Sequence, residues 1–195
     1  MKANLLFILI LVVAKASDLN LEEIREEILE NHNYHRRMHQ VDDLERDSSI
    51  EEMAQAYSEK LASDNKGLIH SYVAGYGENL YSCWSSSGIC VSGEEASEEW
   101  YKEISKYNFD NPGYISGTGH FTQLVWKSTK KIGCGAACNS ANKCYVTCNY
   151  SPQGNIINGN YFAENVLRPL DEANKGLYLN KNKILSIIFV IILLI

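Results

Sequence analysis

Residues 116–129 read Ser-Gly-Thr-Gly-His-Phe-Thr-Gln-Leu-Val-Trp-Lys-Ser-Thr. Two glycines bracket Thr118 in this stretch, so the backbone can bend sharply there. His120 follows the bend directly and begins an apolar run that ends at Trp126. An imidazole between a glycine hinge and a packed segment has a fixed position and an open side. The pattern therefore indicates either a functional histidine or a surface turn that leads into a core helix.

The first sixteen residues have the form of a secretory signal peptide. Met1 and Lys2 precede an apolar block over residues 5–14, and Ala14-Lys15-Ala16 fits the small-x-small cleavage pattern. We therefore expect a signal peptide over residues 1–16 and an exported mature protein that begins at Ser17.

The C-terminal end is apolar, because residues 184–195 are almost entirely Ile, Leu, Val and Phe. As a helix this segment would span about 18 Å, whereas a bilayer core requires roughly 30 Å. An apolar tail behind a short polar spacer is typical of a glycosylphosphatidylinositol (GPI) attachment signal. We expect residues 175–195 to be this signal, with Asn174 as the modified residue and the protein held at the outer cell surface. A poorly inserted tail anchor, or a tail that packs on the domain, is the alternative.

Residues 17–174 are the size of one ordinary domain and long enough to bury a core. The formal charge of the chain is −6, and processing at both ends would take it to −11 because the removed segments contain five lysines and no acid. An acidic domain argues against nucleic acid as a partner and against electrostatic docking to anionic lipid. We expect membrane contact to come from the lipid anchor.

Six cysteines in an exported domain indicate disulfides. One pair, Cys83 and Cys90, brackets a serine-rich loop. The other four bracket a turn symmetrically, and they are Cys134, Cys138, Cys144 and Cys148. Nested pairing of 134 with 148 and of 138 with 144 suits two antiparallel strands. A four-cysteine zinc site is the alternative, but the spacing does not match a zinc ribbon and the compartment is oxidising, so we favour disulfides.

The first predicted helix begins after Asn20, which forms a capping box with Glu23. Its apolar stripe carries three histidines, at positions 32, 35 and 39. Such residues are either metal ligands or core residues that form hydrogen bonds, and we favour the core role. A second helix is expected to open at Ser48 or Ser49.

A third helix is predicted to start at Ser92, with Glu95 three residues later. Its apolar stripe contains Ala96, Trp100, Glu103 and Tyr107. A carboxylate on this stripe must be paired or hydrogen-bonded to stay ionised, so Glu103 is a candidate site residue. Glu99 lies near the same edge and competes for this role.

Two strands are predicted over residues 131–138 and 143–150, joined by a turn over residues 139–142. Another histidine, His70, follows a glycine three positions earlier. The loop between Cys83 and Cys90 is expected to expose Trp84, either as a lid over the core or as a contact for a lipid or protein partner.

Four separate segments resemble the motifs of the CAP superfamily, which contains cysteine-rich secretory proteins, venom antigen 5 and plant pathogenesis-related proteins of class 1. Residues 119–129 and 145–156 resemble its two signatures, and residues 32–36 and 77–80 are similar to its two shorter motifs. The resemblance extends over about residues 19–170. It implies an α+β fold, an α-β-α sandwich with a small antiparallel sheet between helical layers.

The resemblance also implies a cleft lined by two histidines and two glutamates, which are His70, Glu78, Glu103 and His120 in this chain. The glycine hinges independently indicate both histidines, and helical phase independently indicates Glu103. Glu78 is identified by the resemblance alone.

Two imidazoles in one cleft are expected to hold a divalent cation such as Zn²⁺ weakly and exchangeably, with a carboxylate as third ligand or as orienting group.

One hypothesis is an exported, surface-anchored binding protein of defence or immune-modulating type that recognises a lipid, sterol or protein partner, with Trp84 as a contact. The alternative is a metal-dependent hydrolase or protease with Glu103 or Glu78 as general base. A coat protein with a vestigial cleft is a third reading. We favour binding over catalysis because the sequence contains neither an HExxH motif nor a convincing nucleophile.

Overall fold

The structure, a computed structural model, describes residues 19–171 together with 174 and 176. The expected signal peptide and nearly all of the expected attachment signal lie outside these residues, so both stay predictions. Within the described part, none of the helices has the length and apolar character needed to cross a bilayer.

The centre of the fold is a four-stranded sheet with the strand order β1-β3-β4-β2. Its strands are β1 (Glu45–Arg46), β2 (Gly77–Trp84), β3 (Lys131–Cys138) and β4 (Lys143–Ser151). The predicted hairpin is confirmed as β3 and β4, which pair antiparallel. The expected antiparallel sheet is corrected in one respect, because the two-residue β1 pairs parallel to β3 and makes the sheet mixed.

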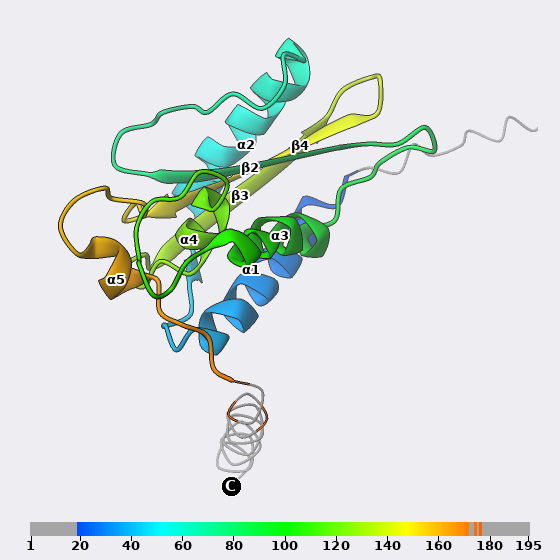
Figure 1. Cartoon of the computed structure of the whole chain (residues 1–195). Helices are drawn as coiled ribbons and strands as arrows, with labels where there is room; N and C mark the ends of the chain where they lie inside the picture. The colour runs from blue at the N-terminus through cyan, green and yellow to red at the C-terminus, as the bar shows by residue number, and fades with distance from the viewer. Residues whose placement is uncertain (1–18, 172–173, 175, 177–195) are drawn as a thin grey trace, which may run out of the picture.

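Helices cover both faces of this sheet, as the sandwich expectation requires (Figure 1). Helix α2 (Ser48–Asp64) lies on one face. The helices of the other face are α1 (Leu21–Met38), α3 (Gly93–Tyr101) and α4 (Gly119–Leu124). A 3₁₀ turn, η1 (Lys102–Lys106), extends α3, and α5 (Tyr161–Asn165) follows the sheet.

The helix starts follow local side-chain chemistry. Asn20 caps α1 by accepting a hydrogen bond from the backbone N–H of Glu23, as predicted. The reciprocal bond of the capping box runs from the side-chain amide of Asn20 to the Glu23 carboxylate, in place of the backbone N–H. Ser92 caps α3 as predicted, since its Oγ accepts from the N–H of Glu95. Helix α2 begins at Ser48, but its cap is Asp47, whose carboxylate accepts from the N–H of the residue two positions later.

Helix α2 lies directly against the backbone of β3 because that strand carries glycine where the two elements cross. A Cβ atom at Gly133 would lie 2.3 Å from the backbone nitrogen of Glu51, and one at Gly135 would lie 2.3 Å from the Cα of Gln55. The close approach lets the Gln55 side-chain amide donate to the carbonyl of Ala136 and accept from its N–H. The helix therefore extends the hydrogen bonding of the sheet.

The three histidines of the predicted stripe form hydrogen bonds within the fold, which confirms their expected core role. His32 and His35 lie in α1, and His39 is its C-cap. His32 is fully buried, donates from Nδ1 to the carbonyl of Ile28 and accepts from the Tyr150 hydroxyl. Burial lowers the pKa of His32 to about 3, so its ring is neutral at pH 7. His35 donates to Glu98, and His39 bonds to the Tyr101 hydroxyl.

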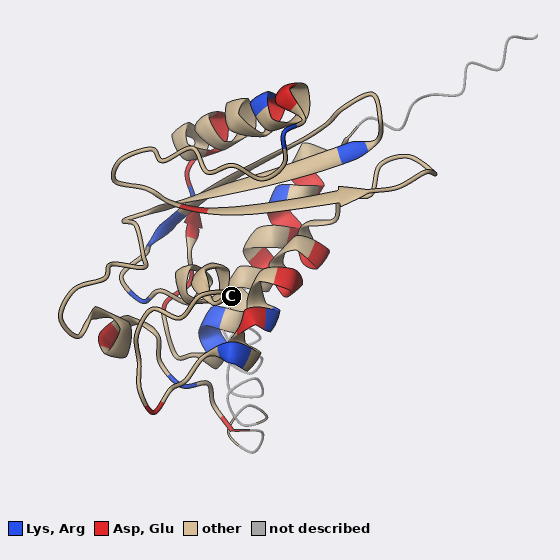
Figure 2. Cartoon of the chain, turned by 45° about the horizontal axis from the view of Figure 1, so that its top comes forward, with Lys and Arg blue, Asp and Glu red and all other residues tan. Residues whose placement is uncertain are grey.

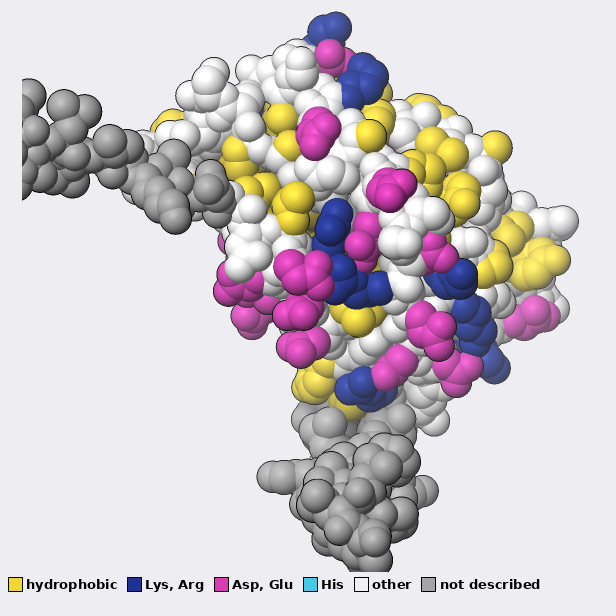
Figure 3. Space-filling model, turned by 180° about the vertical axis from the view of Figure 1, so that it is seen from behind, with side chains coloured by type: hydrophobic (Ala, Val, Ile, Leu, Met, Phe, Trp, Pro, Cys, Tyr) yellow, Lys and Arg dark blue, Asp and Glu magenta, His cyan; other side chains and the backbone are white. Residues whose placement is uncertain are grey.

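Acidic residues recur along α1 and α3 (Figure 2). On the face seen from behind, acidic and basic side chains are interspersed (Figure 3). Arg46, for example, forms ion pairs with both Glu22 and Glu51. Part of the charge is thus balanced locally by ion pairs.

Arg36 connects α1 to the segment that follows α4. Its side chain is 0% exposed. The guanidinium donates to four backbone carbonyls at 2.7–3.0 Å, those of Asp42, Leu124, Trp126 and Thr129. Burial lowers the pKa of Arg36 to about 10, so the group stays charged at pH 7. This side chain therefore supplies donors to four backbone carbonyls, of which the Trp126 carbonyl also accepts from the N–H of Thr129.

We expect Arg36→Met to lower the free energy of unfolding by about 3 kcal/mol or more, because buried acceptors without partners cost about 1–3 kcal/mol each. The neighbouring Arg37 is exposed and paired with Asp43, so Arg37→Met is a matched control that should cost less than about 1 kcal/mol. Urea unfolding of both variants measures the difference. Equal decreases in the free energy of unfolding for the two variants would show that the four hydrogen bonds from Arg36 to carbonyls do not stabilise the fold.

Candidate functional site

The first half of the site is the pair formed by Glu103 and His120. Glu103 Oε1 accepts from Nδ1 of His120 at 2.9 Å. Its Oε2 accepts from the backbone N–H groups of His120 at 2.8 Å and Phe121 at 3.2 Å. One carboxylate therefore fixes the imidazole ring and also satisfies the first N–H groups of α4. The ring lies beside Trp100, with centroids 6.3 Å apart.

Glu103 is paired, as the sequence predicts for a carboxylate on an apolar stripe, but it does not lie in the predicted third helix. Helix α3 ends at Tyr101, and Glu103 lies in the 3₁₀ turn η1. Its side chain is only 17% exposed and is paired, as a carboxylate on an apolar stripe must be. The competing candidate, Glu99, is exposed and forms an ion pair with Lys102 instead.

The second half of the site is the pair formed by His70 and Glu78. Glu78 is the second residue of β2, and its Oε1 accepts from Nδ1 of His70 at 2.7 Å and from the N–H of Ser71 at 2.9 Å. The Ser71 hydroxyl donates to Oε2, and the Asn149 side-chain amide lies 3.5 Å from the same atom. The carboxylate is buried, whereas the His70 ring is partly exposed.

Asn79 connects the two pairs. It follows Glu78 directly in β2, and its side-chain amide donates to the backbone carbonyl of His120 at 3.1 Å. Successive side chains of a strand point to opposite faces. Glu78 therefore binds His70 on one face of β2, while Asn79 binds the His120 carbonyl on the other. Sequence reasoning missed the roles of Asn79 and Ser71, although each directly follows a residue that it had identified.

Both glutamates are held in the ionised form. Burial raises the pKa of Glu103, but the hydrogen bonds from the His120 ring and from two backbone N–H groups outweigh it, and the net pKa is lowered. In the same way, burial raises the pKa of Glu78, and the hydrogen bonds from His70 and Ser71 lower it further than burial raises it. An ionised carboxylate only accepts, so Nδ1 carries the proton in both rings.

The tautomer leaves the Nε2 lone pair of each neutral imidazole available to a cation. In the described part of the chain, no hydrogen bond engages Nε2 of His70 or His120. Only Cys83, Cys90 and Cys144 have three potential ligand atoms within 4.8 Å of one another among the described residues, and all three are in disulfides. The geometry thus favours glutamates that orient the rings over glutamates that bind a cation directly.

The three disulfides match the predicted pairing, which is Cys83 with Cys90, Cys134 with Cys148, and Cys138 with Cys144. The described chain has no free cysteine. Trp84 ends β2 and is 65% exposed, as expected. Its indole N–H donates to the carbonyl of Ala141 in the turn between β3 and β4, so the exposed ring has a defined position.

Comparison with known proteins agrees with this architecture. Residues 29–150 match the cysteine-rich secretory protein family, CAP. The chain belongs to the CAP family. This CAP protein is 43% identical over 151 residues to Golgi-associated plant pathogenesis-related protein 1 of Homo sapiens, an alignment that covers 76% of the chain and 95% of the human protein.

Two further relatives bear on location and metal. Secreted protein RBT4 of Candida albicans is 37% identical over 159 residues, which cover 75% of this chain but 41% of the fungal protein. A crystal structure of NaASP2 with Zn²⁺ superposes with a TM-score of 0.61 and 26% identity, covering 82% of this chain and 97% of NaASP2. Relatives of this CAP protein thus include a Golgi-associated and a secreted protein, and a structural neighbour was solved with zinc.

We expect Glu103→Gln to lower the free energy of unfolding at pH 7 by about 1.5–3 kcal/mol, the range for hydrogen bonds to a charged group. Because the folded pKa of Glu103 lies below its ordinary value of 4.5, the carboxylate stabilises the fold above that pH. This contribution is lost as the pH falls through the folded pKa. Urea unfolding at pH 7 and pH 3 should therefore show a loss that shrinks in acid.

Glu99→Gln is the matched control, since Glu99 is an exposed residue of the same helical stretch. It should change the free energy of unfolding by less than about 0.5 kcal/mol at either pH. A Glu103→Gln loss that is independent of pH would contradict the ionised state assigned to this carboxyl.

Proposed function

We propose that this CAP protein is an exported binding protein whose cleft holds a divalent cation such as Zn²⁺ weakly and exchangeably. The observation that carries the proposal is the pair of Nδ1–carboxylate bonds, which leave Nε2 of His70 and His120 free to donate a lone pair. Imidazoles that bind zinc in proteins characteristically donate their other N–H to a carboxylate in this way. The zinc-containing NaASP2 structure supports the same assignment.

Binding fits the site better than hydrolysis does. A general base needs a free carboxylate with a pKa near the working pH. Both oxygens of Glu103 and of Glu78 already accept hydrogen bonds, and the pKa of each group is lowered rather than raised. These carboxylates are therefore poor proton acceptors and good supports for an imidazole.

Zn²⁺ should raise the thermal and urea stability of the protein, by about 2.7 kcal/mol when free zinc is 100 times its dissociation constant. We expect His70→Ala and His120→Ala each to abolish most of this gain, because two imidazoles supply the protein ligands. Glu78→Gln should weaken zinc binding about 10- to 100-fold, the usual cost of losing a group that orients a ligand. Isothermal titration calorimetry measures the affinities.

Tyr72→Ala is a suitable control for the zinc measurements, since Tyr72 lies next to the His70 ring, is 86% exposed and offers no imidazole. It should leave the zinc affinity unchanged. Undiminished zinc binding by the His70→Ala, His120→Ala double variant would exclude the cleft as the cation site.

The proposal extends to a partner, which is a lipid, a sterol or an extracellular protein met at the cell surface, where Asn174 carries the anchor. Trp84 supports this part, because its exposed indole is held at the end of β2 and offers apolar area to a ligand. The human relative is named for its association with the Golgi and the fungal relative for its secretion, which supports passage through the export route.

Trp84→Ser should weaken binding to sterol or phospholipid at least about tenfold, since burial of a large aromatic side chain contributes about 1.5–3 kcal/mol. Titration of the purified protein with a fluorescent sterol and with phosphatidylcholine vesicles measures this. Tyr114→Ser is the control, because Tyr114 is a similarly exposed aromatic residue in a different loop. Equal affinities for all three proteins would remove Trp84 from the binding surface.

A further inference from the structure

Three cysteines form a row across three neighbouring strands. Cys138 of β3 lies opposite Cys144 of β4, and Cys144 lies opposite Cys83 of β2. Residues that are directly opposite on antiparallel strands point to the same face of the sheet. Cys144 is thus the central member of the row, with a cysteine on either side.

Cys144 is bonded to one neighbour and close to the other. It pairs with Cys138, while Cys83 pairs with Cys90 of the following loop. The Sγ atoms of Cys83, Cys90 and Cys144 nevertheless all lie within 4.8 Å of one another. Opposed residues on antiparallel strands have Cα atoms about 4.5–5.5 Å apart, which lies within the range of about 4.4–6.8 Å that a disulfide requires. Cys144 is therefore placed to pair with either neighbour.

We propose that Cys83, Cys90, Cys138 and Cys144 form a thiol–disulfide exchange site with two bonded states. An external dithiol reduces the Cys83–Cys90 bond and is itself oxidised to a disulfide, leaving two thiols. The Cys83 thiolate then attacks Sγ of Cys144, so the Cys83–Cys144 bond forms and the Cys138–Cys144 bond breaks. Cys138 leaves as a thiolate and takes up the proton that Cys83 released.

The same product results if the dithiol first reduces the Cys138–Cys144 bond. The Cys144 thiolate then attacks Sγ of Cys83 and displaces Cys90. Both routes consume one dithiol and end with a Cys83–Cys144 disulfide and two thiols, at Cys90 and Cys138. Cys83, Cys90 and Cys138 are all partly exposed to a reductant, whereas Cys144 is buried.

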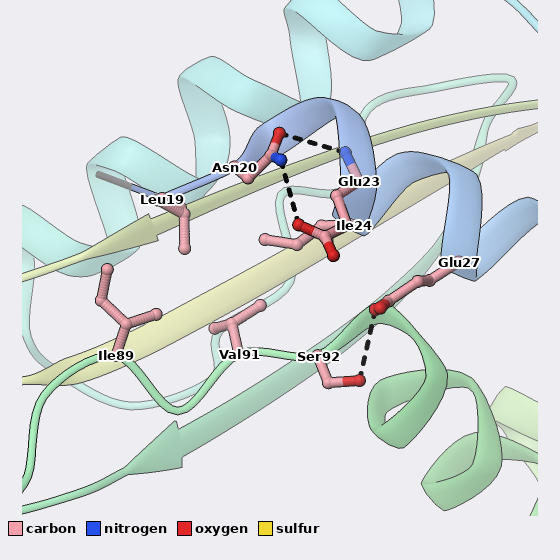
Figure 4. Close-up of a pocket in the computed structure, with 8 residues that line it drawn as sticks. All are labelled: Leu19, Asn20, Glu23, Ile24, Glu27, Ile89, Val91 and Ser92. Atoms are coloured by element: carbon pink, nitrogen blue, oxygen red, sulfur yellow. Dashed lines mark hydrogen bonds between the residues drawn. The ribbon is translucent and has the colours of Figure 1, made fainter. Parts of the chain in front are cut away.

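The exchange breaks the disulfide between β3 and β4, forms a new one between β2 and β4, and releases the loop that ends at Cys90. Residues just before and after Cys90 line a pocket of about 240 Å³ against the start of α1 (Figure 4). Ile89 and Val91 contribute the loop side of this pocket, and Leu19 and Ile24 face them from the helix side. A reductant would thus remove the tether of one pocket wall, while the new disulfide to β4 fixes the end of β2.

The test uses the full-length folded protein and one equivalent of dithiothreitol, followed by alkylation and peptide mapping. We expect two alkylated cysteines per molecule, Cys90 and Cys138, together with a cross-linked peptide that joins Cys83 to Cys144. The buried Cys134–Cys148 bond is the internal reference and should stay intact. Alkylation of Cys83 and Cys90 with the Cys138–Cys144 bond retained would overturn the proposal, as would direct passage to four alkylated cysteines.

A double variant, Cys83→Ser with Cys90→Ser, separates exchange from direct reduction. It lacks the internal attacking thiol, so under the same dose Cys138 should become alkylated at least about tenfold more slowly than in the wild type. An unchanged rate would exclude the route that runs through the Cys83 thiolate. Exchange could then start only at the Cys138–Cys144 bond, and a wild-type peptide map without the Cys83–Cys144 cross-link would exclude that route as well. If the variant does not fold, the wild-type peptide map alone decides.

Discussion

The fold of this CAP protein depends on the buried guanidinium of Arg36. It lies at the C-terminal end of α1 and binds carbonyls on both sides of the turn that leads from α4 into β3. Most carbonyls of that turn lie outside regular strand or helix hydrogen bonding, and a planar group with five donors can bind several of them at once. His120 is the second residue of α4, and the Arg36 contacts fix the other end of the same helix, at Leu124.

The local elements of the structure follow from the sequence because each depends on near neighbours. The capping box at Asn20, the hairpin of β3 and β4, and the nested disulfides all join residues that are close in sequence or symmetric about one turn. The parallel pairing of β1 was not predictable, since two residues offer no periodicity and their partner strand β3 lies about 86 positions further along the chain. Helix α3 likewise ends before its apolar pattern does.

The candidate site also contains residues that the sequence predicts and contacts that only the folded structure reveals. Helical phase identified Glu103 as a carboxylate in need of a partner, but only the fold shows that its partner is His120, 17 positions further along the chain. Glu78 carries no such signal, because in a glycine-rich strand start it looks like any surface acid. Ser71 and Asn79 act through a backbone N–H, a hydroxyl and a side-chain amide toward groups brought near by folding, and no sequence period encodes such contacts.

Each site carboxylate accepts hydrogen bonds both from a histidine ring and from backbone N–H groups, which favours a structural role over proton transfer. Glu103 fixes an imidazole and satisfies the N–H groups that open α4, and Glu78 fixes an imidazole and the N–H of the loop that carries it. Protonating either group during a reaction cycle would weaken the local fold along with the ring contact. A site that keeps its carboxylates ionised at all times is suited to hold a cation, whereas proton transfer would require one of them to be free. The structural role of the glutamates is thus the physical reason to propose cation binding, and not proton transfer, for the two His–Glu pairs.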